Sequence, residues 1–238
     1  MKKLLLILLS ISILLINCKE EDELEYINPP PSIYTYVPDD NFEIALINLG
    51  VDNTLNDTVL TAAIDTIKEL NLYNRYISDL SGIENFAALT YLNCSENQLT
   101  SLDISKNTAL SSLSCFGNQL SNINVNGATA LSSLNCDFNQ LTNINVSGAT
   151  NLINLSCRGN QLTNLNISGA TALTGLDCSE NQLISLDLRN GNNTNLSLVA
   201  NFNPNLYCID VDNENWSIFL SNWIIPPQSF FSEDCGVK

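Results

Sequence analysis

A unit of 21 residues recurs five times in the middle of the chain, and every copy carries its apolar residues at the same places. In each copy a leucine stands two positions before a cysteine, and another leucine stands five positions after it. The five cysteines are Cys94, Cys115, Cys136, Cys157 and Cys178. Fixed periods of about 20 to 50 residues are typical of repeat architectures, in which each unit packs on its neighbours. The pattern therefore predicts a solenoid.

Within each unit the apolar residues alternate with polar residues at two places. In the third copy these places are Leu134 with Cys136 and Ile144 with Val146. A period of two is typical of a β-strand that turns one face to the core. We therefore expect two short strands in each coil, about 4.8 Å from those of the next coil. The predicted fold class is a mainly β solenoid, with two parallel sheets around a narrow apolar core.

The cysteine column faces the core in this arrangement, where a free thiol behaves as a small apolar side chain. A disulfide ladder and a metal site are the alternatives. Parallel Cβ atoms about 4.8 Å apart exceed the ~3.8 Å that a disulfide prefers. Zinc sites draw their cysteines from closely spaced pairs, which a 21-residue line does not supply. Buried structural thiols are the favoured interpretation, and we predict no metal site and no cofactor.

An asparagine stands three residues after each cysteine, where we expect the chain to turn a corner. These residues are Asn97, Asn118, Asn139, Asn160 and Asn181. Backbone groups at a corner lack a ladder partner, and an asparagine amide can both donate to them and accept from them. We also expect the amides of neighbouring coils to meet, as they do in amide ladders.

The consensus L-x-x-L-x-C-x-x-N-x-L resembles the leucine-rich repeat, with cysteine in place of its third leucine. The resemblance covers about residues 67–206 and implies a leucine-rich repeat solenoid. At its start a 22-residue variant has Leu72 in the cysteine slot, and at its end Leu196 breaks the register by about two residues. Atypical terminal coils are expected because they cap an open core.

Residues 34–66 are expected to form the N-terminal cap of the core. A helix is predicted there that begins after Asp39 or Asp40 and ends before Gly50, which suits the position after a helix. The residues expected on its buried face are Phe42, Leu46 and Leu49.

Residues 207–238 are expected to form the C-terminal cap. Cys208 and Cys235 fall outside the 21-residue lattice and the chain is expected to be exported, so we predict a disulfide between them. Closing a loop of that length contributes roughly 3 kcal/mol in the chain-entropy model. Both Thr35–Phe42 and Asn203–Cys235 resemble the caps of internalin-like leucine-rich repeat proteins of the Bacteroidetes type.

The first 18 residues have the features of a signal peptide. Two lysines precede an apolar and serine stretch over residues 4–16, which is too short to span a bilayer as a helix. Residues 15–18 resemble a lipobox, which implies that Cys18 is the lipidated first residue of the mature chain. Ordinary signal-peptide cleavage near residue 18 is the alternative.

Residues 19–33 are expected to form an acidic and proline-rich tether. The run from Lys19 to Glu23 resembles the surface-export signal of Bacteroidetes lipoproteins, and a solvated linker is the plain alternative. The resemblance implies a bacterial outer-membrane lipoprotein that is exposed at the cell surface and anchored through Cys18.

The chain is strongly acidic and contains no histidine. Without Lys2 and Lys3, seven basic residues remain against 25 acidic ones, which gives a net charge of −18. Nucleic acid is disfavoured as a partner because phosphate binding needs clustered Lys and Arg. The missing histidines remove the usual general base and the commonest metal ligand. We therefore predict no catalytic residues.

A partner is expected on the outward face of the first strand. Side chains three and one residues before each cysteine slot, and one residue after it, are expected to point outward, with the second residue after it at the border. The candidates there are Tyr91, Phe116, Asp137, Phe138 and Arg158. Aromatic residues beside an arginine are typical of protein interfaces. The alternative is that the two phenylalanines only cover the corner beside Gly117 or Gly159.

Asparagines line the outward side of the second strand, which keeps a sheet hydrated and could also bind a glycan. The predicted function is a surface-anchored leucine-rich repeat module that binds a protein partner in adhesion and catalyses nothing. A carbohydrate-binding accessory lipoprotein is the alternative.

Overall fold

The computed structural model describes residues 33–146, 148–191, 195–214 and 223–236. The chain divides into two units, Met1–Pro31 and Ser32–Lys238, and all described residues belong to the second. The predicted signal peptide with Cys18, and the tether up to residue 32, lie outside the described residues. So do residues 215–222 of the predicted C-terminal cap. Among the described residues, no helix is both long and apolar enough to cross a membrane.

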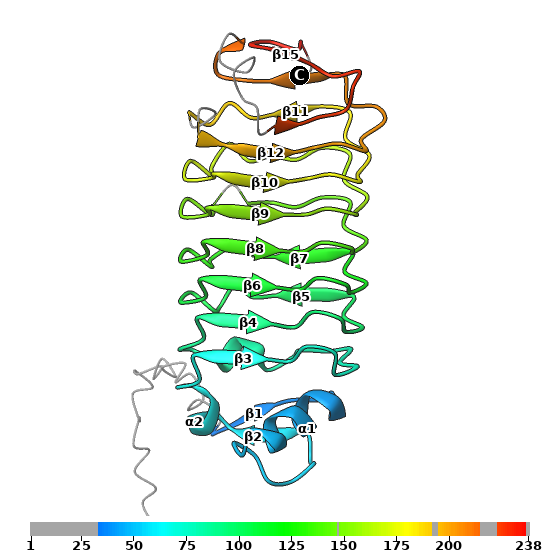
Figure 1. The fold of residues 1–238 in the computed structure, drawn as a ribbon. Helices are drawn as coiled ribbons and strands as arrows, with labels where there is room; N and C mark the ends of the chain where they lie inside the picture. Colours follow the sequence, from blue (N-terminus) through cyan, green and yellow to red (C-terminus); the bar gives the residue numbers. More distant parts are fainter. Residues whose placement is uncertain (1–32, 147, 192–194, 215–222, 237–238) are drawn as a thin grey trace, which may run out of the picture. The chain divides into compact units, whose positions relative to one another are not determined.

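The first strand of each coil joins a parallel eight-stranded sheet, which we call the first sheet (Figure 1). Its strands are β3 (Glu69–Asn71), β4 (Tyr91–Asn93), β6 (Ser112–Ser114), β8 (Ser133–Asn135), β9 (Asn154–Ser156), β10 (Gly175–Asp177), β12 (Ser197–Val199) and β14 (Trp223–Ile224). Equivalent leucines align from coil to coil, as where Leu113 pairs with Leu134. The middle residue is a buried leucine in each of the seven strands from β3 to β12. The two-residue alternation therefore predicted the inward face correctly.

The second strands form a less continuous sheet, which we call the second sheet. A two-stranded piece holds β5 (Ser101–Asp103) and β7 (Asn122–Asn124), and a three-stranded piece holds β11 (Leu186–Asp187), β13 (Cys208–Asp210) and β15 (Phe230–Ser232). Between them only the isolated bridges Asn145↔Asn166 and Asn166↔Asp187 are found among the described residues. The expectation of a second strand in every coil is therefore met only in part, because the coils between β7 and β11 have isolated bridges instead. Alternation decides which side chains turn inward, but it does not ensure a complete ladder.

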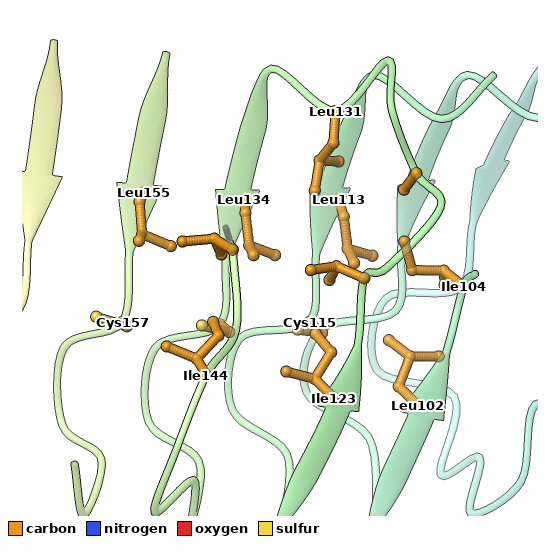
Figure 2. Close-up of a cluster of buried hydrophobic side chains, with 14 of the residues drawn as sticks. Leu102, Ile104, Leu113, Cys115, Ile123, Leu131, Leu134, Ile144, Leu155 and Cys157 are labelled. Carbon is orange, nitrogen blue, oxygen red and sulfur yellow. The ribbon is translucent and has the colours of Figure 1, made fainter. Parts of the chain in front are cut away.

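The core between the two sheets is apolar and continuous. Figure 2 shows Leu134 and Cys115 from the first side meeting Ile123 and Ile144 from the second. All five cysteines of the column are buried and free, which confirms structural thiols and contradicts a disulfide ladder. The Sγ atoms of Cys94 and Cys115 each lie 3.5 Å from a carbonyl oxygen of the following coil. Burial raises the pKa of the Cys94 thiol to about 12.

The asparagine column is buried and bonds to the backbone. Asn118 Nδ2 donates to the carbonyl oxygens of Cys94 (3.0 Å) and Cys115 (3.1 Å), and Asn118 Oδ1 accepts from Leu99 N (3.0 Å). Asn139, Asn160 and Asn181 repeat this arrangement. Backbone pairing is thus confirmed. The expected amide-to-amide ladder is wrong, because the amides link neighbouring coils through their backbones.

The coil after Cys178 has 22 residues, like the first coil and one more than the four between them. Leu176 pairs with Leu198, a separation of 22 residues, and Ala200 takes the place of the cysteine. Asn203 fills the asparagine slot, since its Oδ1 accepts from Leu183 N (2.9 Å) and its Nδ2 donates to Cys178 O (3.0 Å). The predicted shift of about two residues is correct for Leu196, which stands 23 residues after Leu173, but β12 and Asn203 shift by only one. The difference arises because Leu196 stands two residues before the strand leucine Leu198, whereas Leu173 stands three residues before Leu176.

The N-terminal segment packs helix α1 (Asp40–Asn48) with strands β1 (Tyr34–Tyr36) and β2 (Thr58–Leu60), which pair antiparallel. The short helices α2 (Thr61–Ile64) and η1 (Ile83–Asn85) follow. Asp39 Oδ1 accepts from Phe42 N (3.0 Å), and Gly50 has a φ of +75°, so both predicted helix ends are confirmed. Phe42 and Leu46 are buried, but Leu49 is exposed. The helix ends at Asn48, and residue 49 leaves its buried face.

The predicted disulfide between Cys208 and Cys235 is present, with the two Cα atoms 5.9 Å apart. It ties β13 to the segment that follows β15. Asp210 reinforces this link, because its Oδ1 accepts from Cys235 N (2.7 Å).

Candidate functional site

Each coil leaves the first sheet through a residue with left-handed backbone, two positions after the cysteine slot. We call these residues the corner column; they are Asn74, Glu96, Gly117, Phe138, Gly159, Glu180 and Phe202, with φ between 51° and 65°. The left-handed backbone lets the corner N–H bond to the next coil, as where Phe138 N donates to Arg158 O (2.8 Å). Glycine adopts this region freely, whereas a bulky side chain there is an outlier.

Large residues and glycines alternate along the corner column from Glu96 to Glu180. A Cβ atom placed on Gly117 would lie 2.9 Å from Glu96 Oε1, and one placed on Gly159 would lie 2.8 Å from Phe138 Cδ1. Glu96 and Phe138 therefore each lean over the glycine of the next coil. The idea that a ring covers Gly159 is thus correct for Phe138. The ring nevertheless remains 42% exposed, so covering the corner is not its whole effect.

Two phenylalanines, an arginine and a glutamate contact one another at this edge of the first sheet. The rings of Phe116 and Phe138 meet edge to face, with centroids 5.6 Å apart and planes at 87°. The guanidinium carbon of Arg158 lies 5.1 Å from the Phe138 centroid. Its Nη2 atom is 2.7 Å from Glu180 Oε1, and this bond raises the pKa of Arg158 above its ordinary value. We call these four residues the aromatic–arginine cluster.

Asp137 lies beside the cluster and accepts hydrogen bonds from the neighbouring coil that carries Arg158. Its Oδ1 accepts from Ser156 Oγ (2.7 Å) and from the backbone N of Arg158 (2.7 Å). Burial raises the pKa of this carboxyl, while the hydrogen bond from Ser156 opposes the change. Asp137 thus helps to order the strand that presents Arg158.

Tyr91 lies apart from the cluster. It is 37% exposed and pairs with Ser112 at the start of the strands, whereas Phe116 and Phe138 follow the ends of β6 and β8. The structure therefore brings together four of the five predicted surface residues and leaves Tyr91 at the opposite edge of the sheet.

The position one residue after the cysteine slot, expected on the outward face, is buried in two coils. Ser95 and Ser179 are buried there. Ser95 Oγ bonds Ser114 Oγ of the next coil (2.7 Å), and Ser179 Oγ donates to Asp177 Oδ1 (2.5 Å). A small hydroxyl can turn back onto the sheet in this way, whereas Phe116 and Arg158 cannot.

Sequence reasoning missed two exposed aromatic residues on the same edge. Tyr73 is 51% exposed one position after Leu72, and Phe202 is 68% exposed in the corner column. Both stand at outward or border positions of their coils, but Leu72 and Ala200 replace the cysteine from which these positions are counted.

Two shallow depressions lie on the sheets. The first, of about 380 Å³, lies on the first sheet over Gly175, where the side chain of Asn154 occupies the place that a Cβ atom would take. The second, of about 510 Å³, lies on the second sheet between rows of asparagine. The asparagines that line it are Asn122, Asn124, Asn126, Asn143 and Asn145.

The cluster has the chemistry of a binding surface. The full sequence contains no histidine, and within the described ranges no three His, Cys, Asp or Glu side chains gather as metal ligands. The column cysteines are buried and their pKa values are raised by burial, so they are poor nucleophiles. Apolar ring edges, a guanidinium and a carboxylate remain available for contact.

No protein-family model matches the chain. A stretch of 77 residues, 32% of the chain, is 40% identical to internalin J of Listeria monocytogenes serotype 4b (strain F2365), of which it spans 8%. Among solved structures, the functional domain of InlJ from Listeria monocytogenes, which includes a cysteine ladder, matches 74% of this chain and 52% of its own, at 27% identity and a TM-score of 0.45. The plant peptide hormone receptor RGFR1 in complex with RGF2 matches 64% of this chain and 29% of its own, at 21% identity and a TM-score of 0.49. Over this 77-residue stretch the chain is similar to internalin J, and its coils have the form of leucine-rich repeats.

Proposed function

We propose that this chain is a surface-anchored leucine-rich repeat module that binds a protein partner through the edge of its first sheet. The observation that carries this proposal is the ring of Phe138. It stays 42% exposed at a φ of 51°, a backbone position where both neighbouring coils have glycine. Non-glycine residues in this region cost about 1–3 kcal/mol each and concentrate at functional sites.

The composition of the cluster favours a protein over a glycan at this place. Phe116 meets Phe138 edge to face, and the ion pair of Arg158 with Glu180 lies beside the two rings. Aromatic residues and arginine are enriched in the energetically important parts of protein interfaces. The cluster offers this mixture on a rigid stack of strands.

The proposed module is non-catalytic. General acid–base catalysis needs a titratable group in reach of a substrate. The chain has no histidine, and the column cysteines are enclosed in the core. The half-buried carboxyl of Asp137 is hydrogen-bonded within the sheet.

The proposal includes the domain plan and the anchor. Residues 1–18 would be a lipoprotein signal peptide, 19–33 a tether, 34–66 a cap, 67–206 the repeats and 207–238 the second cap. Cys18 would hold the protein in the outer membrane. Replacing Cys18 with Ala should release the protein from the membrane fraction, and its retention there would count against the anchor.

The binding site is tested with the full chain displayed on cells. Phe116→Ala combined with Phe138→Ala should abolish cross-linked capture of the protein partner while the melting temperature is maintained. Tyr36→Ala combined with Tyr207→Ala removes two exposed aromatic rings outside the cluster and serves as the matched control. Unchanged capture by the cluster variant would contradict the site.

A carbohydrate-binding accessory lipoprotein is the second candidate. It is favoured by the depression on the second sheet, where asparagine amides repeat from coil to coil. A glycan array should then give clean binding to one polysaccharide class, and Asn122→Ala with Asn143→Ala should remove it. An array without such binding would dismiss this candidate.

A further inference from the structure

The surroundings of the aromatic–arginine cluster carry a surplus of negative charge. Glu180, Asp177 and Asp137 all act on the charge of Arg158. Three carboxylates therefore act on one guanidinium, and the carboxylate of Glu96 lies beside Gly117, the residue that follows Phe116. A partner that brings positive charge to this edge would be attracted to it.

Arg158 holds its place through two exposed interactions. Its Nε (3.2 Å) and Nη2 (2.7 Å) both donate to Glu180 Oε1, and its guanidinium covers the Phe138 ring at 5.1 Å. The side chain of Arg158 is 43% exposed and that of Glu180 is 36% exposed. Exposed ion pairs and exposed cation–π contacts are both weak. The guanidinium can therefore leave at little cost.

The ring itself does not depend on Arg158 for its position. Its left-handed backbone directs it toward Gly159, where the missing Cβ leaves the space that it fills, and Phe116 contacts its edge. Departure of Arg158 would expose one ring face beside a free carboxylate. Both groups are already in place for another cation.

We propose that Phe138 and Glu180 form a binding site for an arginine side chain of the protein partner, and that Arg158 occludes this site in the free protein. The inference rests on the proposed function, since it specifies the chemistry of that partner. Arginine fits better than lysine because its planar guanidinium can stack on a ring and donate several hydrogen bonds at once. The incoming group replaces both contacts of Arg158, which then moves into solvent.

The test uses a probe of defined chemistry, the acetylated and amidated peptide Gly-Arg-Gly. Binding to the full-length protein in neutral detergent is followed through the aromatic NMR signals of Phe138. Arg158→Ala should bind the peptide roughly tenfold more tightly than the wild type, because the internal competitor is gone. The peptide with citrulline in place of arginine, which has nearly the same shape without the charge, should bind neither protein.

Lys106→Ala is the matched control, since it removes one positive charge from an exposed position on another part of the chain. It should leave the affinity for the peptide within about twofold of the wild type. Adding Glu180→Gln to Arg158→Ala should cancel the gain. Equal affinities of wild type and Arg158→Ala would overturn the proposal, and so would an equal gain in Lys106→Ala.

Failure of this inference can be told apart from failure of the proposed function. If Arg158→Ala shows no gain while the double phenylalanine variant still abolishes partner capture, the arginine site alone is overturned. If the double variant captures the partner normally, the proposed function fails, and with it the partner chemistry inferred here.

Discussion

The two sheets come from the same coils and share one core, yet only the first is continuous. The first pairs eight strands and extends into its corner, where Glu96 N donates to Phe116 O (2.8 Å). The second is interrupted between β7 and β11. The buried asparagines lie at the corner of the first sheet and link each coil to the one before it. We call these asparagines, with the hydrogen bonds that they make between coils, the asparagine clamp. The comparison teaches that this clamp, rather than the apolar pattern, distinguishes the continuous sheet from the interrupted one.

If the core is truly shared, truncation on either side should destabilise the fold equally. Leu134 in the first sheet and Ile144 beside the interrupted part of the second are both almost fully buried. Replacing either with Ala should lower the free energy of unfolding by about 2–5 kcal/mol. Urea denaturation measures both. A much smaller loss for Ile144→Ala would show that the broken sheet is also loosely packed.

The asparagine clamp should matter more than any other polar group in the coil. Asn139→Ala leaves the N–H of Leu120 and the carbonyls of Cys115 and Cys136 without this partner. Buried unsatisfied groups cost about 1–3 kcal/mol each, so we expect a loss of about 3 kcal/mol in the free energy of unfolding.

Asn143→Ala is the matched control for the clamp, because Asn143 is exposed on the second sheet only four residues away. Surface substitutions of this kind usually change stability by less than about 0.5 kcal/mol. Similar losses in the two variants would refute the distinction between the corner clamp and the asparagine rows.

The corner column allows a smaller, opposite test. Phe138→Gly removes the left-handed strain but also the ring contacts, so stability should stay level or rise by about 1 kcal/mol while partner capture is lost. Gly159→Ala should lower stability by about 1–2 kcal/mol, because an alanine is strained in left-handed backbone and its Cβ atom would meet the Phe138 ring. Thermal unfolding distinguishes the two. A stability loss in Phe138→Gly equal to that of Gly159→Ala would mean that Phe138 is retained for packing.

The sequence predicts the coil well because period and polarity decide which residues face the core. Cys136 and Asn139 recur at fixed places, and Cys208 with Cys235 stand out because they leave the lattice. The corner backbone was not predictable in the same way. Glycine marks it in only two coils, while Phe138, Phe202 and the other non-glycine residues of the column adopt nearly the same φ against their preference.

The contacts of the candidate site were harder to foresee than its members. Phe116, Phe138 and Arg158 were identifiable from their outward positions. Their union with Glu180 depends on side-chain rotamers that reach across coils, since Arg158 and Glu180 are 22 residues apart. Neither period nor polarity specifies such a pairing.

The smallest expected difference between the two sheets is in the pKa values of two aspartates, Asp137 and Asp103. Burial raises the pKa of Asp137 on the first sheet above the ordinary 3.8. Burial also opposes the charge of Asp103 on the second sheet, but hydrogen bonds from Ser105 and Asn124 outweigh it and lower the pKa. Carbon NMR titration of the two carboxyl groups should therefore give values on opposite sides of 3.8.

The same shifts should give opposite effects of pH on stability. For Asp103 the folded pKa lies below the unfolded one, so its contribution is present above pH 3.8 and is lost as the pH falls through the folded pKa. For Asp137 the folded pKa is the higher one, so its contribution is complete below pH 3.8 and is lost as the pH rises through the folded pKa. As the pH falls, the wild type should thus gain stability relative to Asp137→Asn. It should lose stability relative to Asp103→Asn over the same change. Parallel slopes for the two variants would mean that the first sheet does not bury its carboxyl as described.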